Sequence, residues 1–173
     1  MIHHVTAHGI DARPLFADDA DRWRFIGLLS DVTREVAWRC LSFCLMETHY
    51  HLLVQEGETP LSRAMRLLNG RYVTQYNHRH GRRGHLFEAR YRDRLVSTEE
   101  HLLAAVRYIA RNPLEVSACV RPEDWRWGSY GQLVGAARGW SFVSTAWTLA
   151  LFAPERERAI QIVREFVESV PGT

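Results

Sequence analysis

Apolar residues gather along the chain in short runs and in helically spaced stripes, and the short runs predict strands. Three such runs lie in the first third of the sequence, at 2–7, 38–46 and 49–55. The polar pair Glu47 and Thr48 separates the last two runs, so a tight strand-to-strand connection is expected there. A fourth strand is predicted at 86–96, where Arg90, Arg92 and Arg94 are two residues apart and would share one face.

Helically spaced apolar residues predict two helices between these strands. The first spans 18–36. The second begins after Thr59, a capping hydroxyl, with Pro60 at the first helical position, and its apolar stripe reaches Tyr76. A loop rich in Arg, His and Gly is expected from 77 to 84.

A third helix is predicted behind the fourth strand. Ser97 and Glu100 form a capping box that starts it at Thr98, and Pro113 is expected to end it after Asn112. Two terminal helices are predicted at 145–152 and 154–170. The order of elements predicts an α+β domain with helices packed on one face of a largely antiparallel sheet, in a ferredoxin-like arrangement, plus C-terminal helices.

The charged residues are distributed unevenly along the chain. All 22 basic residues are arginine and the net charge is only +2. Residues 63–111 hold eleven arginines and four acidic residues, whereas 1–62 hold five against nine and 112–173 hold six against seven. The central block of +7 is either an electrostatic footprint for a polyanion or a solvated basic face.

The cysteines and the N-terminus bear on the cellular compartment. Cys40, Cys44 and Cys119 are an odd number without metal-type spacing, so buried reduced thiols are expected. The sequence has no signal region and no apolar stretch of the roughly 18 residues that a membrane span needs. A cytoplasmic protein without a membrane partner is therefore predicted.

Two histidines on one predicted strand are the first candidates for chemistry. His49 and His51 are two residues apart, so both point to the same face with Cα atoms roughly 6–7 Å apart. Two such imidazoles either share one metal ion or are satisfied histidines at a strand end. Tyr50 lies on the opposite face and is expected to be buried.

The predicted helix from Thr98 offers two further candidates. Tyr108 and Asn112 are one turn apart, outside the apolar stripe and on the same flank as the small Ala105. A helix beside the sheet would thus present a phenol and an amide oxygen to the histidine face. The alternative is that Tyr108 only packs at the rim of the domain.

With these residues, the chain resembles the REP-associated tyrosine transposases, which are single-strand DNA transposases of the HUH tyrosine nuclease superfamily. The matching segments are His4-Val5-Thr6, Met46 to Val54, Gly84 to Tyr91, Arg107 to Pro113 and Trp125 to Tyr130. The resemblance covers residues 2 to about 135 in the family's order. It differs from the commoner pattern at Glu47 and Thr48, which replace a proline and an asparagine, and at the bulkier Tyr50.

The resemblance implies a role for each matching residue. His49 and His51 correspond to the pair that binds a divalent metal, Asn112 completes the metal site and Tyr108 is the nucleophile. The metal is Mg²⁺ or Mn²⁺ by resemblance, although imidazole with amide oxygen also suits zinc. The implied reaction cleaves and rejoins single-stranded DNA, with a hairpin-forming repeat as target, through a 5′-phosphotyrosine. Residues 1–135 would form the nuclease domain and 136–173 a helical extension, in a monomer or a homodimer.

The basic block then becomes a candidate DNA surface. Its arginines would bind successive phosphates along a DNA strand. The aromatic residues Tyr76, Phe87 and Tyr91 either stack on unpaired bases or belong to the core. The arginines assigned to DNA are Arg71, Arg79, Arg82, Arg83, Arg90, Arg92 and Arg94.

Two other functions remain open at the level of sequence. One is a catalytically silent DNA-binding protein of the same fold that keeps the site residues. The other is a two-histidine phosphoesterase acting on a small molecule, which predicts a second His-x-[Ser/Thr] element. None of His3, His8, His78, His80, His85 and His101 has that context.

Overall fold

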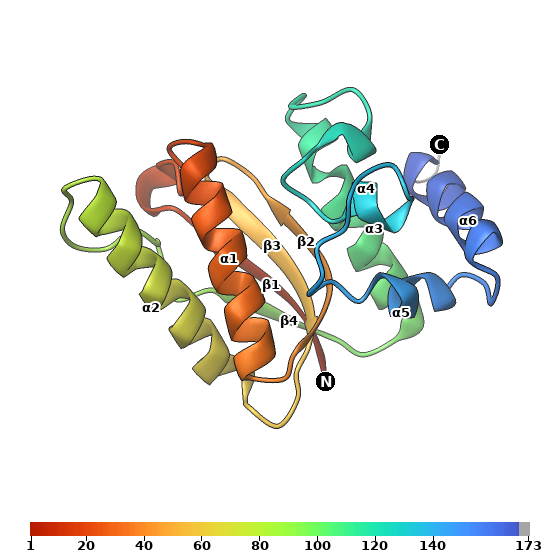
Figure 1. The fold of residues 1–173 in the computed structure, drawn as a ribbon, viewed down its shortest axis with the longest axis horizontal. Coiled ribbons are helices and arrows are strands. Elements are labelled where there is room, and N and C mark those ends of the chain that lie inside the picture. Colours follow the sequence, from red (N-terminus) through yellow and green to blue (C-terminus); the bar gives the residue numbers. More distant parts are fainter. Residues whose placement is uncertain (170–173) are drawn as a thin grey trace.

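A single antiparallel sheet organises the molecule, seen in a computed structural model that describes residues 1–169. Its strands are β1 (Ile2–His8), β2 (Arg39–Leu45), β3 (His49–Gln55) and β4 (Arg92–Val96), in the spatial order β2-β3-β1-β4. Together with the helices between them, this is the ferredoxin-like order β-α-β-β-α-β. The predicted α+β fold is therefore confirmed (Figure 1).

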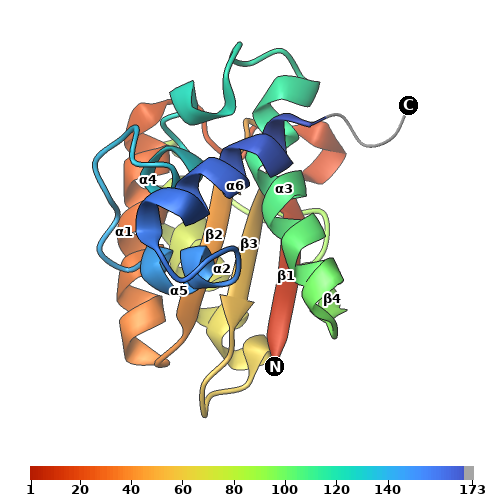
Figure 2. The same ribbon diagram turned by 90° about the vertical axis from the view of Figure 1, so that its right-hand side faces the viewer.

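Helices cover both faces of the sheet. On one face lie α1 (Asp19–Glu35) and α2 (Leu61–Arg79), whose apolar stripes share a core with the inward residues of the strands. The opposite face carries α3 (Glu99–Glu115), α5 (Thr145–Ala150) and α6 (Arg156–Glu168), which form a second core around the sheet residues Leu41 and Leu53. Figures 1 and 2 show the sheet between these two layers, and the short α4 (Tyr130–Leu133) joins the second layer.

In the middle of the sheet, alternate residues of the strands point to opposite faces, as expected. Val5 and Ala7 of β1 are buried towards α1 and α2. Tyr50 is fully buried on that side as well, where its hydroxyl donates to the Oδ1 of Asn69 over 2.6 Å. Tyr76 belongs to the same core, so it is not a stacking surface for bases.

The fourth strand is shorter than predicted, because the ladder with β1 ends at Arg92. Phe87 forms one isolated bridge to Gly9, whereas Thr6 pairs with Arg92. Between these two points β1 has two residues and the other segment has four, so the latter bulges out of the ladder. The predicted strand at 86–91 is therefore wrong, and Arg90 precedes β4 rather than belonging to it.

Three predicted helix ends are also wrong. Helix α3 continues through Pro113 to Glu115, because a proline in the last turn removes only one intrahelical hydrogen bond close to where such bonds end anyway. Thr98 is its N-cap and accepts from the backbone N–H of His101, so the helix starts one residue later than expected. At α2 the cap comes from the Glu56 carboxylate, which accepts from the N–H of Leu61, and not from Thr59.

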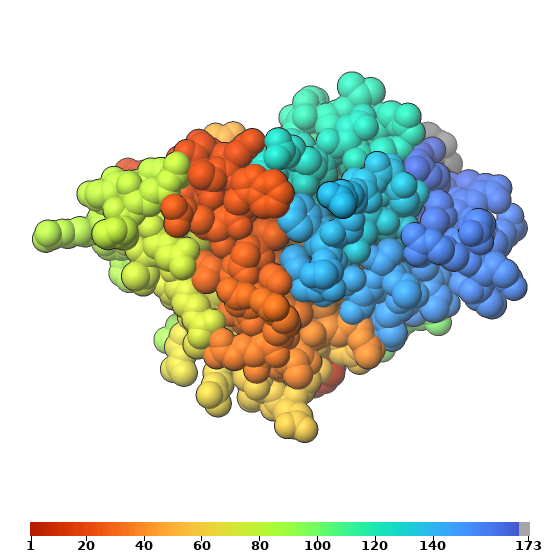
Figure 3. Space-filling model, viewed as in Figure 1, coloured from red at the N-terminus to blue at the C-terminus, as the bar shows by residue number. Residues whose placement is uncertain are grey.

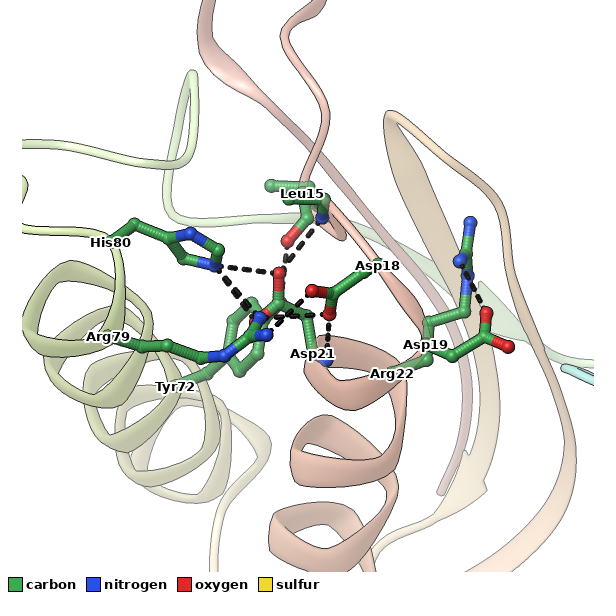
Figure 4. A network of polar contacts seen from close by, with 9 residues as sticks. Leu15, Asp18, Asp19, Asp21, Arg22, Tyr72, Arg79 and His80 are labelled. Carbon is green, nitrogen blue, oxygen red and sulfur yellow. Dashed lines mark hydrogen bonds and ion pairs between the residues drawn. The ribbon is translucent and has the colours of Figure 1, made fainter.

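A charged cluster joins α2 to the N-terminus of α1 (Figure 4). The fully buried Asp21 accepts from Arg79 over 2.6 Å and lies 2.9 Å from the imidazole of His80. Arg79 also contacts Asp18, and this contact holds the pKa of that carboxyl at about 2. The cluster fixes the two helices that cover one face of the sheet.

The C-terminal helices match the two predicted elements, with shorter bounds. Ala159, Val163 and Val167 of α6 are fully buried in the second core, and Arg111 of α3 donates to the backbone oxygen of Val167 over 2.7 Å. The predicted helix end at Val170 lies outside the described residues. Within 1–169, no helix has the length and apolar character needed to cross a membrane.

The cysteines are free thiols, as predicted. Cys40 and Cys44 are buried in the sheet, and burial raises the pKa of Cys40 to about 12. Cys119 is partly exposed, so the prediction of a buried thiol is wrong for this residue.

Candidate active site

A cavity of about 650 Å³ lies between α3 and the edge of the sheet formed by β1 and β4. The sheet contributes histidines, a threonine and two arginines, while α3 contributes a tyrosine and small residues. Its main lining residues are His4, Thr6, His8, His49, His51, Arg92, Arg94, His101, Ala105 and Tyr108. Both histidines and the tyrosine predicted from the sequence therefore face one cavity.

Strand β3 places the two predicted histidines side by side. Because side chains alternate along a strand, His49 and His51 share the face towards α3, while Tyr50 between them faces the opposite core. Their ring centroids are 5.0 Å apart and the rings are nearly perpendicular. This pair can thus direct two imidazole nitrogens to a common point.

His51 is held by two residues of β1. The hydroxyl oxygen of Thr6 lies 3.1 Å from its Nδ1, and the Nε2 of His4 lies 3.2 Å from the same atom. Its other nitrogen, Nε2, is buried and has no hydrogen-bond partner among the described residues. Burial, followed by the neighbouring His49 and His4, lowers the pKa of His51 to about 3, so the ring is neutral at pH 7.

His49 is oriented in the same manner. Thr48 places its hydroxyl oxygen 3.3 Å from Nδ1, and His8 stacks on the ring at a centroid distance of 5.0 Å. The Nε2 atom lies 3.1 Å from the Oδ1 of Asn112. Burial lowers the pKa of His49 below its ordinary value, which also favours the neutral ring.

Helix α3, which covers the face of the sheet that bears the histidines, brings Tyr108 and Asn112 to them. Asn112 is buried, whereas Tyr108 is 45% exposed to solvent. The Tyr108 ring stands edge-on to His51 with centroids 5.2 Å apart, and it lies 5.7 Å from the His4 ring. The small Ala105 one turn earlier lines the same cavity, so the phenol is accessible from solvent and adjacent to the histidine pair.

The polar atoms of this site fit a divalent cation. Among residues 1–169 no group of three His, Cys, Asp or Glu side chains is placed to hold a metal, and the amide of Asn112 is the further donor that contacts the histidine pair. Neighbouring ligands of an octahedral ion at 2.0–2.1 Å are about 3 Å apart. The 3.1 Å hydrogen bond between His49 Nε2 and Asn112 Oδ1 has about that spacing, and the buried, unpartnered Nε2 of His51 would be available as a third donor.

The predicted DNA-binding arginines fall into two groups. Arg92 and Arg94 line the cavity on β4, and Arg83 and Arg90 are exposed. Arg82 lies 5.9 Å from the centre of the Tyr76 ring. In contrast, Arg71 donates to Glu35 over 2.7 Å, and Arg79 belongs to the cluster with Asp18 and Asp21 (Figure 4). These last two join α2 to α1.

Sequence reasoning gave no site role to three residues of β1 that line the cavity, namely His4, Thr6 and His8. In the sequence these three residues are two positions apart along the first predicted strand, and this spacing indicates that their side chains lie on one face. Only the pairing of Thr6 with His51 and of His8 with His49 in the sheet shows that this face meets the histidine pair.

Comparisons with known proteins match the sequence to a family and the fold to a solved structure. The model of the family described as "Transposase IS200 like" matches residues 1–112. A solved structure of a REP-associated tyrosine transposase bound to a REP hairpin superposes with a TM-score of 0.63 at 17% sequence identity, covering 81% of this chain and 84% of that one. The comparison with curated proteins gives no match.

Proposed function

Because the chain belongs to the IS200-like transposase family, we propose that it is a metal-dependent transposase that cleaves and rejoins single-stranded DNA at hairpin-forming repeats. One observation carries the proposal, which is that Tyr108 of α3 and His51 of β3 meet at a ring distance of 5.2 Å in one open cavity. The hairpin bound to the structurally similar transposase supports DNA of that shape as the substrate.

Three residues would hold the cation, which we propose to be Mg²⁺ or Mn²⁺. His49 and His51 would donate through Nε2, since Thr48 and Thr6 occupy the Nδ1 atoms, and Asn112 would donate through Oδ1. When bound, such an ion offsets negative charge on the scissile phosphate, which otherwise repels a nucleophile.

Tyr108 would act as the nucleophile. Its ordinary phenol pKa of about 10 makes it a weak nucleophile at neutral pH, so attack depends on the positively charged surroundings of the phosphate. The phenol oxygen bonds to phosphorus and loses its proton, while the bond to the 3′ oxygen breaks and that oxygen takes up a proton. The products are a 5′-phosphotyrosine and a free 3′-hydroxyl. Attack by a 3′-hydroxyl reverses these steps and rejoins a strand without an external energy source.

The arginines of the cavity would hold the strand. Arg92 and Arg94 lie on β4 beside the site, so their guanidinium groups can bind phosphates next to the cleaved bond. Arg82, Arg83 and Arg90 would extend this surface along the α2–β4 connection. Arg71 and Arg79 are engaged by carboxylates of α1, so we expect them to contribute least to DNA affinity.

We propose that residues 136–173 form an extension that supports the catalytic unit of residues 1–135. The side chains of Ala159, Val163 and Val167 in α6 pack in the same core as Val106 and Ile109 of α3. Since Tyr108 and Asn112 are on that helix, support from α6 would fix both of them against the sheet.

A strand-cleavage assay tests the proposed function. The substrate is single-stranded DNA from imperfect palindromes flanking the protein's own gene, with Mn²⁺ or a chelator. Wild type is expected to nick it only with the metal, and Tyr108→Phe is expected not to. Equal nicking by Tyr108→Phe would contradict the proposal, and binding of the hairpin without any cleavage by wild type would select a silent DNA-binding protein instead.

A further inference from the structure

Four tryptophans surround a second pocket, of about 250 Å³, at the other edge of the sheet. Trp23 comes from α1, and Trp125, Trp127 and Trp140 come from the segment that runs beside β2. That segment is tied to the edge strand, because the N–H of Leu45 donates to the Trp127 oxygen over 2.8 Å. The active-site cavity reaches β4 at the opposite edge and shares no lining residue with this pocket.

The pocket opens where two distant parts of the chain meet. Figure 3 shows the seam between α1, in orange and red, and the blue segment that follows α4. Trp23 of α1 lines the pocket and is 50% exposed. Its position is off the stripe of buried residues on α1, which includes Phe25, Leu29 and Val32, so packing of the core does not explain a tryptophan there.

Two other indole rings fix the orientation of Trp23. Trp127 is buried and stands edge-on to it at a centroid distance of 5.5 Å, and Trp140 lies 5.4 Å away at an angle of 60°. Edge-to-face contacts of this kind hold an aromatic ring in place, and half of the Trp23 surface stays exposed beside them. Trp23 is therefore an ordered aromatic surface that remains accessible to a planar ligand.

The charge around the pocket is positive. Arg126 and Arg138 line it, and no acidic residue does. The Arg126 guanidinium lies 4.4 Å from the centre of the Trp127 ring and 6.0 Å from that of Trp23. Its one carboxylate contact, with Asp19 at 3.5 Å, involves two side chains that are more than half exposed, so solvent weakens this ion pair.

We propose that this pocket binds one unpaired nucleobase, stacked on Trp23, together with its phosphate at Arg126 and Arg138. Every base has a flat face that can stack on indole, and guanidinium groups bind phosphate through paired hydrogen bonds. The two arginines disfavour a cationic ligand, and an apolar peptide would leave them without a partner. The inference rests on the proposed function, because the nucleotide belongs to a single-stranded arm of the same DNA substrate.

The location of the pocket determines what it contributes. Because it lies at the β2 edge and the cavity of Tyr108 at the β4 edge, the nucleotide bound there is not the one that is cleaved. The pocket would therefore increase affinity for substrates with an arm long enough to reach it. It would leave the cleavage rate of fully bound DNA unchanged.

The test compares hairpins with single-stranded arms of increasing length on either side, by fluorescence anisotropy. Wild type is expected to gain affinity once an arm reaches the pocket. Trp23→Ala is expected to lose about 5- to 100-fold of that gain, as removal of one base-stacking contact implies. Arg138→Ala is expected to lose part of it, and both variants should bind the armless hairpin as wild type does.

Two controls separate base stacking from general damage. Trp147→Ala removes a tryptophan that has its own arginine, Arg39 at 5.6 Å, but does not line the pocket, so it should keep the gain. Arms with abasic sites keep the phosphates but lack bases. Wild type should lose affinity for them, whereas Trp23→Ala should bind normal and abasic arms equally.

The outcomes distinguish the two proposals. If wild type binds and cleaves DNA but Trp23→Ala keeps the full gain at every arm length, the pocket has no role in binding and the proposed function stands. The same conclusion follows if Trp147→Ala loses as much as Trp23→Ala. If wild type binds no single-stranded DNA at all, both the pocket proposal and the proposed function are wrong.

Discussion

The hydroxyl oxygen of Thr6 lies 3.1 Å from the Nδ1 atom of His51, and this contact connects the first strand to the centre of the site. It occupies one nitrogen of the imidazole and leaves the other, Nε2, buried without a partner among the described residues. Under the proposed function, a ring held in this way would bind the cation through Nε2 with its orientation and its neutral state already fixed.

Replacing this hydroxyl should weaken metal binding without removing a ligand. Thr6→Val keeps the shape of the side chain but cannot hold His51, and loss of such an outer contact typically costs about 10- to 100-fold in metal affinity. Isothermal titration with Mn²⁺ measures the effect. Thr74→Val is the matched control, since that exposed hydroxyl only donates to a backbone oxygen of its own helix. Equal affinities of the two variants would show that Thr6 does not position His51.

Stability without metal should depend on pH through the buried histidines. The pKa of His51 falls from 6.5 to about 3 on folding, so between these values the unfolded chain binds a proton that the folded chain does not. The free energy of unfolding is therefore expected to be highest above pH 6.5 and to fall as the pH decreases towards 3. Urea denaturation with a chelator, at several pH values, measures this. His51→Gln should show a shallower dependence, and an equal slope would contradict the assignment.

The arginines of β4 should account for part of the salt dependence of DNA binding. Each phosphate contact on single-stranded DNA contributes a slope of about −0.7 in log affinity against log salt. Arg92→Ala and Arg94→Ala are each expected to reduce the slope by about that amount, measured by anisotropy between low and physiological salt. Arg158→Ala on α6, where the exposed guanidinium donates to Gln161, should leave the slope unchanged. If Arg158→Ala reduced the slope as much as Arg94→Ala, the assignment of phosphate contacts to the β4 arginines would be wrong.

Support of α3 by the C-terminal helix should be measurable as stability. Val163 is fully buried in the second core, and shortening it to alanine should cost about 2 kcal/mol through lost burial and the cavity left behind. Val120→Ala is the control, because that side chain is 94% exposed and should change nothing. Urea denaturation gives both values. An unchanged stability of Val163→Ala would mean that α6 does not support the catalytic unit.

Local patterns in the sequence were sufficient to predict the strands and the helix that carry the site residues. The apolar runs predicted β2 and β3, the period of two placed His49 with His51, and the helical wheel placed Tyr108 with Asn112. Each of these relationships lies within one strand or one helix, where the geometry is fixed by the backbone.

Contacts between different strands and helices could not be predicted from such local patterns. The role of His4, Thr6 and His8 depends on the pairing register of β1 with β3. The truncation of β4 depends on the bulge opposite Ala7 and His8, and the engagement of Arg71 and Arg79 depends on how α2 packs on α1. Charge along the sequence therefore overstated the number of arginines free to contact DNA.

Covalent capture of DNA by Tyr108 is the most direct test of the account. The protein is incubated with the hairpin DNA and Mn²⁺, digested, and the linked peptide is identified by mass spectrometry. The account predicts a nucleotide joined through its 5′-phosphate to Tyr108, absent from Tyr108→Phe and from samples with chelator. A link to any other residue, or an adduct that persists in Tyr108→Phe, would contradict it.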